Sequence, residues 1–141
     1  MVYTMGSSYF FSQYPDFTPG DIDTIEIIDT DRFKQTRQLT GQGICIFQLK
    51  RHKDKQEYID WALKSNLGMV VGKFLIPGFC QEIGFTVEDL LQVKPLIDIL
   101  DDKHKYEEII YNSYLANGDF VLTDEQRAAA YKSYKESRAA L

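Results

Sequence analysis

The spacing of apolar residues changes near residue 50, and this change constrains the fold more strongly than any other feature of the sequence. Before it lie short β-favouring runs that adjoin a glycine, at residues 2–5, 21–28 and 44–49, as is typical of strands. After it, apolar residues recur every three or four positions, as they do along one face of a helix. The sequence therefore predicts an α+β fold with a small sheet in its N-terminal half and a helical C-terminal half.

Two short helices are expected within the N-terminal half. Gly6, Ser7 and Ser8 follow the first run, and a serine there is expected to cap a helix over residues 9–14, because a serine hydroxyl accepts hydrogen bonds from the free amides of a first turn. A second, polar helix is expected over residues 33–39. Both predictions depend on local sequence alone.

The helical half contains several start and stop signals. Thr86 and Thr123 are expected to cap helices, and Thr123 with Gln126 matches a capping box. Gly118 is a strong helix stop, since glycine readily adopts the left-handed conformation at a helix end. The apolar stretch from 67 to 83 contains a proline, so we expect a kinked helix or two short ones.

Length and cysteine usage predict one domain over residues 1–141, with a sheet core over 1–50 and a helical portion over 51–141. A chain of this length buries roughly two thirds of its extended surface, so its core needs no disulfide or structural metal. Cys45 and Cys80 lie far apart and belong to no CxxC motif. They indicate neither a zinc site nor a disulfide framework.

The sequence has no signal-peptide pattern at its start and no apolar stretch that approaches the ~20 residues needed to span a bilayer. We therefore expect a soluble, cytoplasmic protein with no membrane partner. The net charge of −5 argues against holding nucleic acid by bulk charge. This charge is unevenly spread, since residues 32–55 contain seven Lys and Arg and one acid, whereas residues 82–108 contain eight acids and three Lys.

The basic run over residues 32–55 has two interpretations. The simpler one is a solvated face. The functional one is a local cationic rim for a triphosphate or a nucleic-acid acceptor.

The sharpest chemical signal is Asp21-Ile22-Asp23, at the start of a predicted strand. Alternate residues of a strand point to the same side, about 6 to 7 Å apart. Two carboxylates this close repel each other unless a cation lies between them. A hard cation such as Mg²⁺ accepts oxygen ligands of this kind and keeps other positions for water and phosphate. The alternative is an exposed junction between a turn and a strand.

Gly6-Ser7-Ser8 lies between a predicted strand and a predicted helix. Glycine lets the backbone approach a phosphate closely, and the amides that follow it can donate to an anion. Such a segment also makes ordinary turns. Together with the carboxylate pair it predicts a polyphosphate and a metal at adjacent strand ends of one sheet.

These residues resemble the signature of the DNA polymerase β-like nucleotidyltransferase superfamily. That signature is an apolar residue, Gly, Gly or Ser, then roughly nine to thirteen residues, then Asp, an apolar residue, and Asp or Glu. Here Met5-Gly6-Ser7 is followed by 13 residues and then by Asp21-Ile22-Asp23. The resemblance covers about residues 2–49 and implies a small mixed sheet as the core.

The resemblance also implies roles for four residues. Gly6 and Ser7 would bind the triphosphate of a nucleotide, and Asp21 and Asp23 would be the catalytic carboxylates that hold Mg²⁺ or Mn²⁺. The implied reaction transfers a nucleoside monophosphate from a nucleoside triphosphate to a hydroxyl of a protein, a small molecule or a nucleic acid.

One departure from the family concerns a third carboxylate, which active members usually place on the next strand. The corresponding segment here, residues 43–49, contains no acid. Glu26 is expected on the opposite face of its strand, Asp29 more than about 20 Å along it from Asp21, and Asp54 only after the next strand. This departure motivates a second hypothesis, a non-catalytic member that binds nucleotide or a protein partner in an antitoxin-like or regulatory role.

A third hypothesis is a helical assembly protein in which the motif is a coincidence. Other polar and aromatic residues are expected to be structural. His52 and His104 have no partners at metal-ligand spacing, and Cys45 is expected to be a small buried residue. Five tyrosines are expected to join the last two helices rather than to stack bases: Tyr106, Tyr111, Tyr114, Tyr131 and Tyr134.

Overall fold

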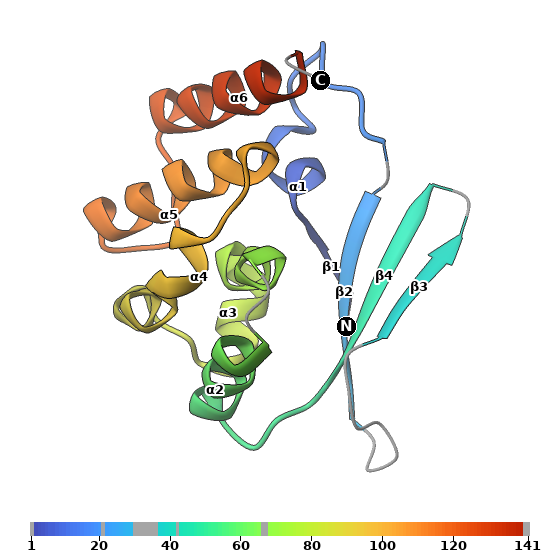
Figure 1. Ribbon diagram of the computed structural model, residues 1–141, viewed down its shortest axis with the longest axis vertical. Coiled ribbons are helices and arrows are strands. Elements are labelled where there is room, and N and C mark those ends of the chain that lie inside the picture. Colours follow the sequence, from blue (N-terminus) through green and yellow to red (C-terminus); the bar gives the residue numbers. More distant parts are fainter. Residues whose placement is uncertain (1, 21, 30–36, 42, 66–67, 140–141) are drawn as a thin grey trace. The chain divides into compact units, whose positions relative to one another are not determined.

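The computed structural model describes residues 2–20, 22–29, 37–41, 43–65 and 68–139. It divides into two compact units, a sheet unit over residues 1–53 and a helical unit over residues 54–141 (Figure 1). The prediction of an α+β fold, with a sheet first and helices afterwards, is confirmed. Whether the two units form a single domain stays a prediction.

The described residues of the sheet unit form four strands in the order β1-β2-β4-β3. Strands β2 and β4 run parallel, and the two outer strands are antiparallel to their neighbours. The sheet is therefore mixed. The strands are β1 (Val2–Met5), β2 (Ile22–Ile28), β3 (Arg37–Gly41) and β4 (Ile44–Lys50).

The prediction of a helix over residues 33–39 is wrong for residues 37–39, which are the part of this range that the structure describes. Residues 37–39 belong to β3, in which Leu39 lies opposite Ile46 of β4. The remaining residues, 33–36, lie outside the described part of the chain. The polar sequence is compatible with a helix locally, but pairing with the edge of β4 satisfies its backbone groups.

One face of the sheet is apolar and buried. Ile25 and Ile27 of β2 share this face with Phe47 and Leu49 of β4, which lie opposite them in the parallel register. The residues between them point to the other face and are half-buried or exposed, because successive side chains of a strand alternate. The start of β2 lies at one end of this core.

The short helix α1 (Ser7–Phe11) follows β1 directly. Phe10 and Phe11 are fully buried, and the ring of Phe11 lies 6.3 Å from that of Phe17. The prediction that a serine caps this helix is wrong, since Gly6, which has no side chain to accept a hydrogen bond, occupies the cap position. The helix also begins at Ser7 and ends at Phe11, earlier than expected.

The described part of the helical unit forms eight helices, three of which are 3₁₀ helices named η. Its apolar stretch forms two helices divided before Pro77, as one of the two predicted alternatives stated. No helix in the described ranges is both long and apolar enough to cross a lipid bilayer. The helices are α2 (Lys55–Ser65), η1 (Gly68–Leu75), α3 (Pro77–Ile83), η2 (Val87–Val93), α4 (Lys94–Asp98), η3 (Asp102–His104), α5 (Lys105–Asn117) and α6 (Asp124–Ala139).

The predicted start and stop signals of this unit are present. Thr86 and Asp89 form a capping box at η2, and Thr123 and Gln126 exchange hydrogen bonds of 2.9 and 3.1 Å at the start of α6. Gly118 ends α5 with a φ of 75°. All of these features depend on residues close together in the sequence, which explains why local patterns predict them.

Tyrosines hold α5 against three other helices. The Tyr111 hydroxyl donates to the carbonyl of Leu90 at 2.8 Å, and the Tyr114 hydroxyl donates to that of Leu75 at 3.0 Å. Tyr106 packs edge-on against Tyr134 of α6, with ring centroids 5.4 Å apart. The expectation that tyrosines join the last two helices holds for this pair, whereas Tyr111 and Tyr114 bond to η2 and η1.

Candidate functional site

The structure brings Gly6 next to Asp23. Met5 lies opposite Asp23 in the antiparallel pairing of β1 with β2, and Gly6 follows immediately. A Cβ atom placed on Gly6 would lie 3.6 Å from Oδ2 of Asp23, which is ordinary van der Waals distance. Gly6 and Asp23, 17 positions apart in the sequence, therefore lie close together at one end of the sheet.

The backbone of Gly6 requires glycine. Its φ of 67° and ψ of −152° lie in a region that residues with a side chain rarely adopt. Its carbonyl accepts hydrogen bonds from the amides of Tyr9 and Phe10 at 3.1 and 3.3 Å. The first amides of α1 have no acceptor within the helix, so those of Ser7 and Ser8 are the donors that an anion would find at this turn.

The two serines after Gly6 differ in burial. Ser7 is half-buried, so its hydroxyl lies partly within reach of a ligand. Ser8 is buried, and its Oγ has no hydrogen-bond partner among the described residues. Gly6 is buried as well, so Ser7 is the most exposed of the three residues, and phosphate binding by Gly6 and Ser7 stays a prediction.

Asp23 is half-buried and lies on the same face of β2 as Ile25. Asp21, the other predicted metal ligand, lies outside the described residues. Within the described ranges, no group of three or more His, Cys, Asp or Glu side chains is placed to hold one metal ion. The structure thus places one of the two predicted carboxylates at the glycine turn.

Cys45 is the residue of β4 that pairs with Asp23. It lies opposite Asp23 in the parallel pairing of β2 with β4, and its side chain is only 4% exposed. The same face of β4 continues with Phe47 and Leu49. The sequence alone shows that β4 contains no acid. The strand register is needed to show that Cys45 is the residue beside Asp23.

The other acids considered from the sequence have partners elsewhere. Glu26 accepts a hydrogen bond of 3.1 Å from Gln48, on the opposite face from Asp23. Asp29 follows the far end of β2 and lies 3.8 Å from Arg51. Asp54 accepts a hydrogen bond of 3.0 Å from the amide of Glu57 in the first turn of α2. Within the sheet unit, neither Glu26 nor Asp29 therefore lies beside Asp23.

Two members of the basic run have acidic partners. Arg51 lies 3.8 Å from Asp29, and Lys55 lies 2.9 Å from Asp89. Burial alone would raise the pKa of Asp89, but hydrogen bonds from Thr86 and Lys55 outweigh it and hold the pKa below its usual value. Residues 32 and 34 lie outside the described part, so the cationic rim stays a prediction.

Two further groups that could carry chemistry have structural partners. The thiol of Cys80 is buried and donates to the carbonyl of Phe74 at 3.1 Å. Burial and the nearby charge of Asp89 raise its pKa, which makes it a weak nucleophile. His104 lies 2.6 Å from Asp101 and lowers the pKa of that carboxyl by hydrogen bonding.

No family model, curated protein or solved structure matches this chain. The resemblance to the nucleotidyltransferase superfamily therefore depends on the motif residues themselves. Of these residues, the structure places Gly6 close to Asp23, and the resemblance stays a prediction.

Proposed function

We propose that this chain is a metal-dependent nucleotidyltransferase that transfers a nucleoside monophosphate from a nucleoside triphosphate to a hydroxyl acceptor. The observation that carries the proposal is the approach of Gly6 to Asp23. A turn without a side chain beside a carboxylate is the arrangement that a metal–triphosphate complex requires, because phosphate and metal must be bound side by side.

The chain's own residues suit the two parts of this ligand. The turn at Gly6 and Ser7 would position the triphosphate with backbone amides and a hydroxyl. Asp23, with Asp21 as its predicted partner, offers the oxygen ligands that Mg²⁺ or Mn²⁺ prefers. A divalent cation bound there would neutralise phosphate charge and favour ionisation of the acceptor hydroxyl.

The proposed reaction is an in-line displacement at the α-phosphorus. The acceptor oxygen forms a bond to this phosphorus while the bond to the bridging oxygen of the β-phosphate breaks, and pyrophosphate leaves. The acceptor proton passes to solvent or to a neighbouring base. In this reaction the protein would hold the triphosphate at Gly6 and Ser7, so that the α-phosphorus lies beside Asp23.

The position of Cys45 favours a second candidate, a protein that binds nucleotide or a protein partner without transferring anything. A buried thiol stands where a third carboxylate would share the metal and assist deprotonation of the acceptor. Triphosphate binding without transfer to any acceptor, in either Mg²⁺ or Mn²⁺, would support this candidate. Robust transfer would exclude it.

The test is an assay of labelled-nucleotide transfer and triphosphate binding with the double variant Asp21→Asn, Asp23→Asn. We expect it to lose both transfer and Mg²⁺-dependent binding while its thermal melt stays close to that of the wild type. Asp29→Asn is the matched control, since Asp29 is an exposed acid at the other end of β2. Unchanged transfer in the double variant would contradict the proposal, and so would an equal loss in the control.

A further inference from the structure

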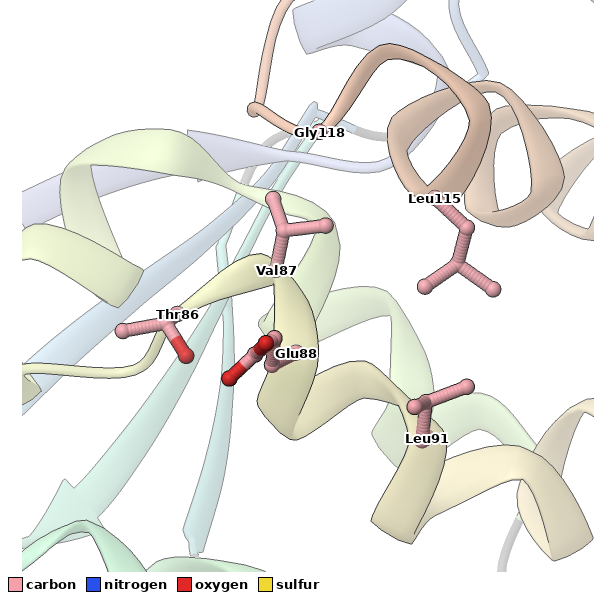
Figure 2. Close-up of a pocket in the computed structure, with 6 residues that line it drawn as sticks. All are labelled: Thr86, Val87, Glu88, Leu91, Leu115 and Gly118. Atoms are coloured by element: carbon pink, nitrogen blue, oxygen red, sulfur yellow. The ribbon is translucent and has the colours of Figure 1, made fainter.

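An open apolar groove lies on the surface of the helical unit. It has a volume of about 620 Å³ and is lined by Thr86, Val87, Glu88, Leu91, Leu115 and Gly118. Leu91 on η2 and Leu115 on α5 extend from opposite walls (Figure 2). Leu91 is 61% exposed and Leu115 is half-buried. The groove thus offers apolar surface that this unit leaves uncovered.

Both walls of the groove are held in place by hydrogen bonds. At one wall, Thr86 and Asp89 form a capping box, and the Tyr111 hydroxyl binds the carbonyl of Leu90 at 2.8 Å. At the other wall, the side-chain amides of Asn117 and Gln126 exchange hydrogen bonds of 2.8 and 3.1 Å across the turn at Gly118. A preformed groove loses little conformational freedom when a ligand binds.

The chain near the groove carries acids without a base between Lys73 and Lys94 and between Lys105 and Arg127. Residues 74–93 contain three acids and no Lys, Arg or His, and residues 106–126 contain five acids and likewise no base. Two of these eight acids, Asp89 and Glu107, are buried. Glu88 lines the groove, and Asp119 follows Gly118 at its end; both are exposed. The groove is therefore bordered by the exposed carboxylates of Glu88 and Asp119, whereas the buried Asp89 is paired with Lys55 at 2.9 Å.

We propose that this groove binds a basic amphipathic helix of a protein partner. Apolar side chains of that helix fill the space between Leu91 and Leu115, and Lys or Arg side chains beside them face Glu88 and Asp119. The walls are helices whose backbone groups are already bonded internally, so strand addition has no edge to use and a helix in a groove is the suitable mode. The inference is independent of nucleotide transfer, because every residue involved belongs to the helical unit.

The test uses three labelled synthetic peptides of about 15 residues, long enough for partial helix formation. The first has leucines three and four positions apart and lysines beside them, the second has glutamates in place of lysines, and the third is the first with its order scrambled. Fluorescence anisotropy with the whole chain measures binding. We expect the first peptide to bind, with weaker binding at higher salt, and the other two to bind at least about tenfold more weakly.

Variants of the chain locate the binding. Leu91→Asp is expected to weaken binding of the first peptide by about tenfold or more. Ile99→Asp is the matched control, because Ile99 is an apolar residue of the same unit that is 49% exposed but lies outside the groove. It should leave binding unchanged. Glu88→Lys should reduce the preference for the basic peptide over the acidic one.

Several results would overturn the proposal. One is that no peptide binds, or that the scrambled peptide binds as well as the ordered one. Another is that Leu91→Asp leaves binding intact. A third is that the chain sediments as a dimer that Leu91→Asp dissociates, since the groove would then be an interface between two copies.

Discussion

The sheet unit over residues 1–53 contains six acids and six Lys and Arg, whereas the helical unit over residues 54–141 contains fifteen acids and ten Lys and Arg. The whole net charge of −5 thus belongs to the helical unit. A neutral unit with a glycine turn beside a carboxylate suits a polyanionic ligand whose charge a metal offsets. An acidic unit with an apolar groove suits a basic partner. The two proposals therefore assign a different class of ligand to each unit.

The units also differ in the charges that they bury. The helical unit buries Lys73 and Glu107, which are 3% and 4% exposed, whereas Ser8 is the most polar side chain among the described buried residues of the sheet unit. Burial raises the pKa of Glu107 to about 8; the nearby Lys73 opposes this rise and Asp101 adds to it. Proton binding is thus expected to govern the stability of the helical unit, and metal binding the activity of the sheet unit.

The largest expected effect concerns Gly6 in the sheet unit. Gly6→Ala forces a side chain into a strained backbone region beside Asp23, so we expect nucleotide transfer to fall by about 100-fold or more. Gly84→Ala is the matched control, because Gly84 has a φ of 76°, with open space around it, in the helical unit. It should lower the melting temperature without affecting transfer. Equal losses of transfer in both variants would show that the effect is on folding.

The next largest effect is expected in the pH dependence of the free energy of unfolding of the helical unit. Between pH 4.5 and about 8 the folded chain keeps the Glu107 proton while the unfolded chain loses it. The free energy of unfolding should therefore fall as pH rises, on the order of 1 kcal/mol per pH unit. Urea denaturation followed by the fluorescence of Trp61, the single tryptophan of the chain, measures this in the helical unit. Glu107→Gln should flatten the dependence, and Glu108→Gln, which changes a half-buried neighbour, should retain it.

A smaller effect is expected from Cys45→Asp in the sheet unit. A buried carboxylate beside Asp23 should lower the free energy of unfolding by about 2 kcal/mol in the absence of metal. Mg²⁺ should restore part of this loss, because a metal that binds only the folded state stabilises it. Cys45→Ser is the control, which Mg²⁺ should not stabilise more than it stabilises the wild type. If Mg²⁺ raised the unfolding free energy of both variants equally, Cys45 would not be part of the proposed metal site.

The smallest effect is expected from Tyr114→Phe in the helical unit. This change removes the buried hydrogen bond to the carbonyl of Leu75 and should cost about 1 kcal/mol of unfolding free energy. Urea denaturation measures the loss. Nucleotide transfer should be unchanged. A large loss of transfer would show that nucleotide transfer in the sheet unit depends on the packing of the helical unit.

Features that depend on neighbouring residues were predictable from the sequence. The capping boxes at Thr86 and Thr123 and the helix end at Gly118 follow from side chains a few positions apart. The three strand runs and the change to helical spacing near residue 50 follow from the pattern of apolar residues. In each case the interaction that stabilises the structure lies within the window that the pattern covers.

Features that depend on pairing between distant segments were not predictable. Residues 37–41 form a strand because β4 is beside them, and Cys45 stands next to Asp23 because of the parallel register. The cap of α1 is the backbone of Gly6 rather than a serine, because the chain turns sharply after β1. The groove between Leu91 and Leu115 likewise requires η2 and α5 to be packed.

The most direct test of the account is a crystal structure of the whole chain with Mn²⁺ and a non-hydrolysable nucleoside triphosphate, in which anomalous scattering locates the metal. The account predicts an anomalous peak about 2 Å from a carboxylate oxygen of Asp23, with the triphosphate against Gly6 and Ser7. A metal and triphosphate bound elsewhere, or no triphosphate at saturating concentration, would contradict the claim that these residues form a nucleotide site.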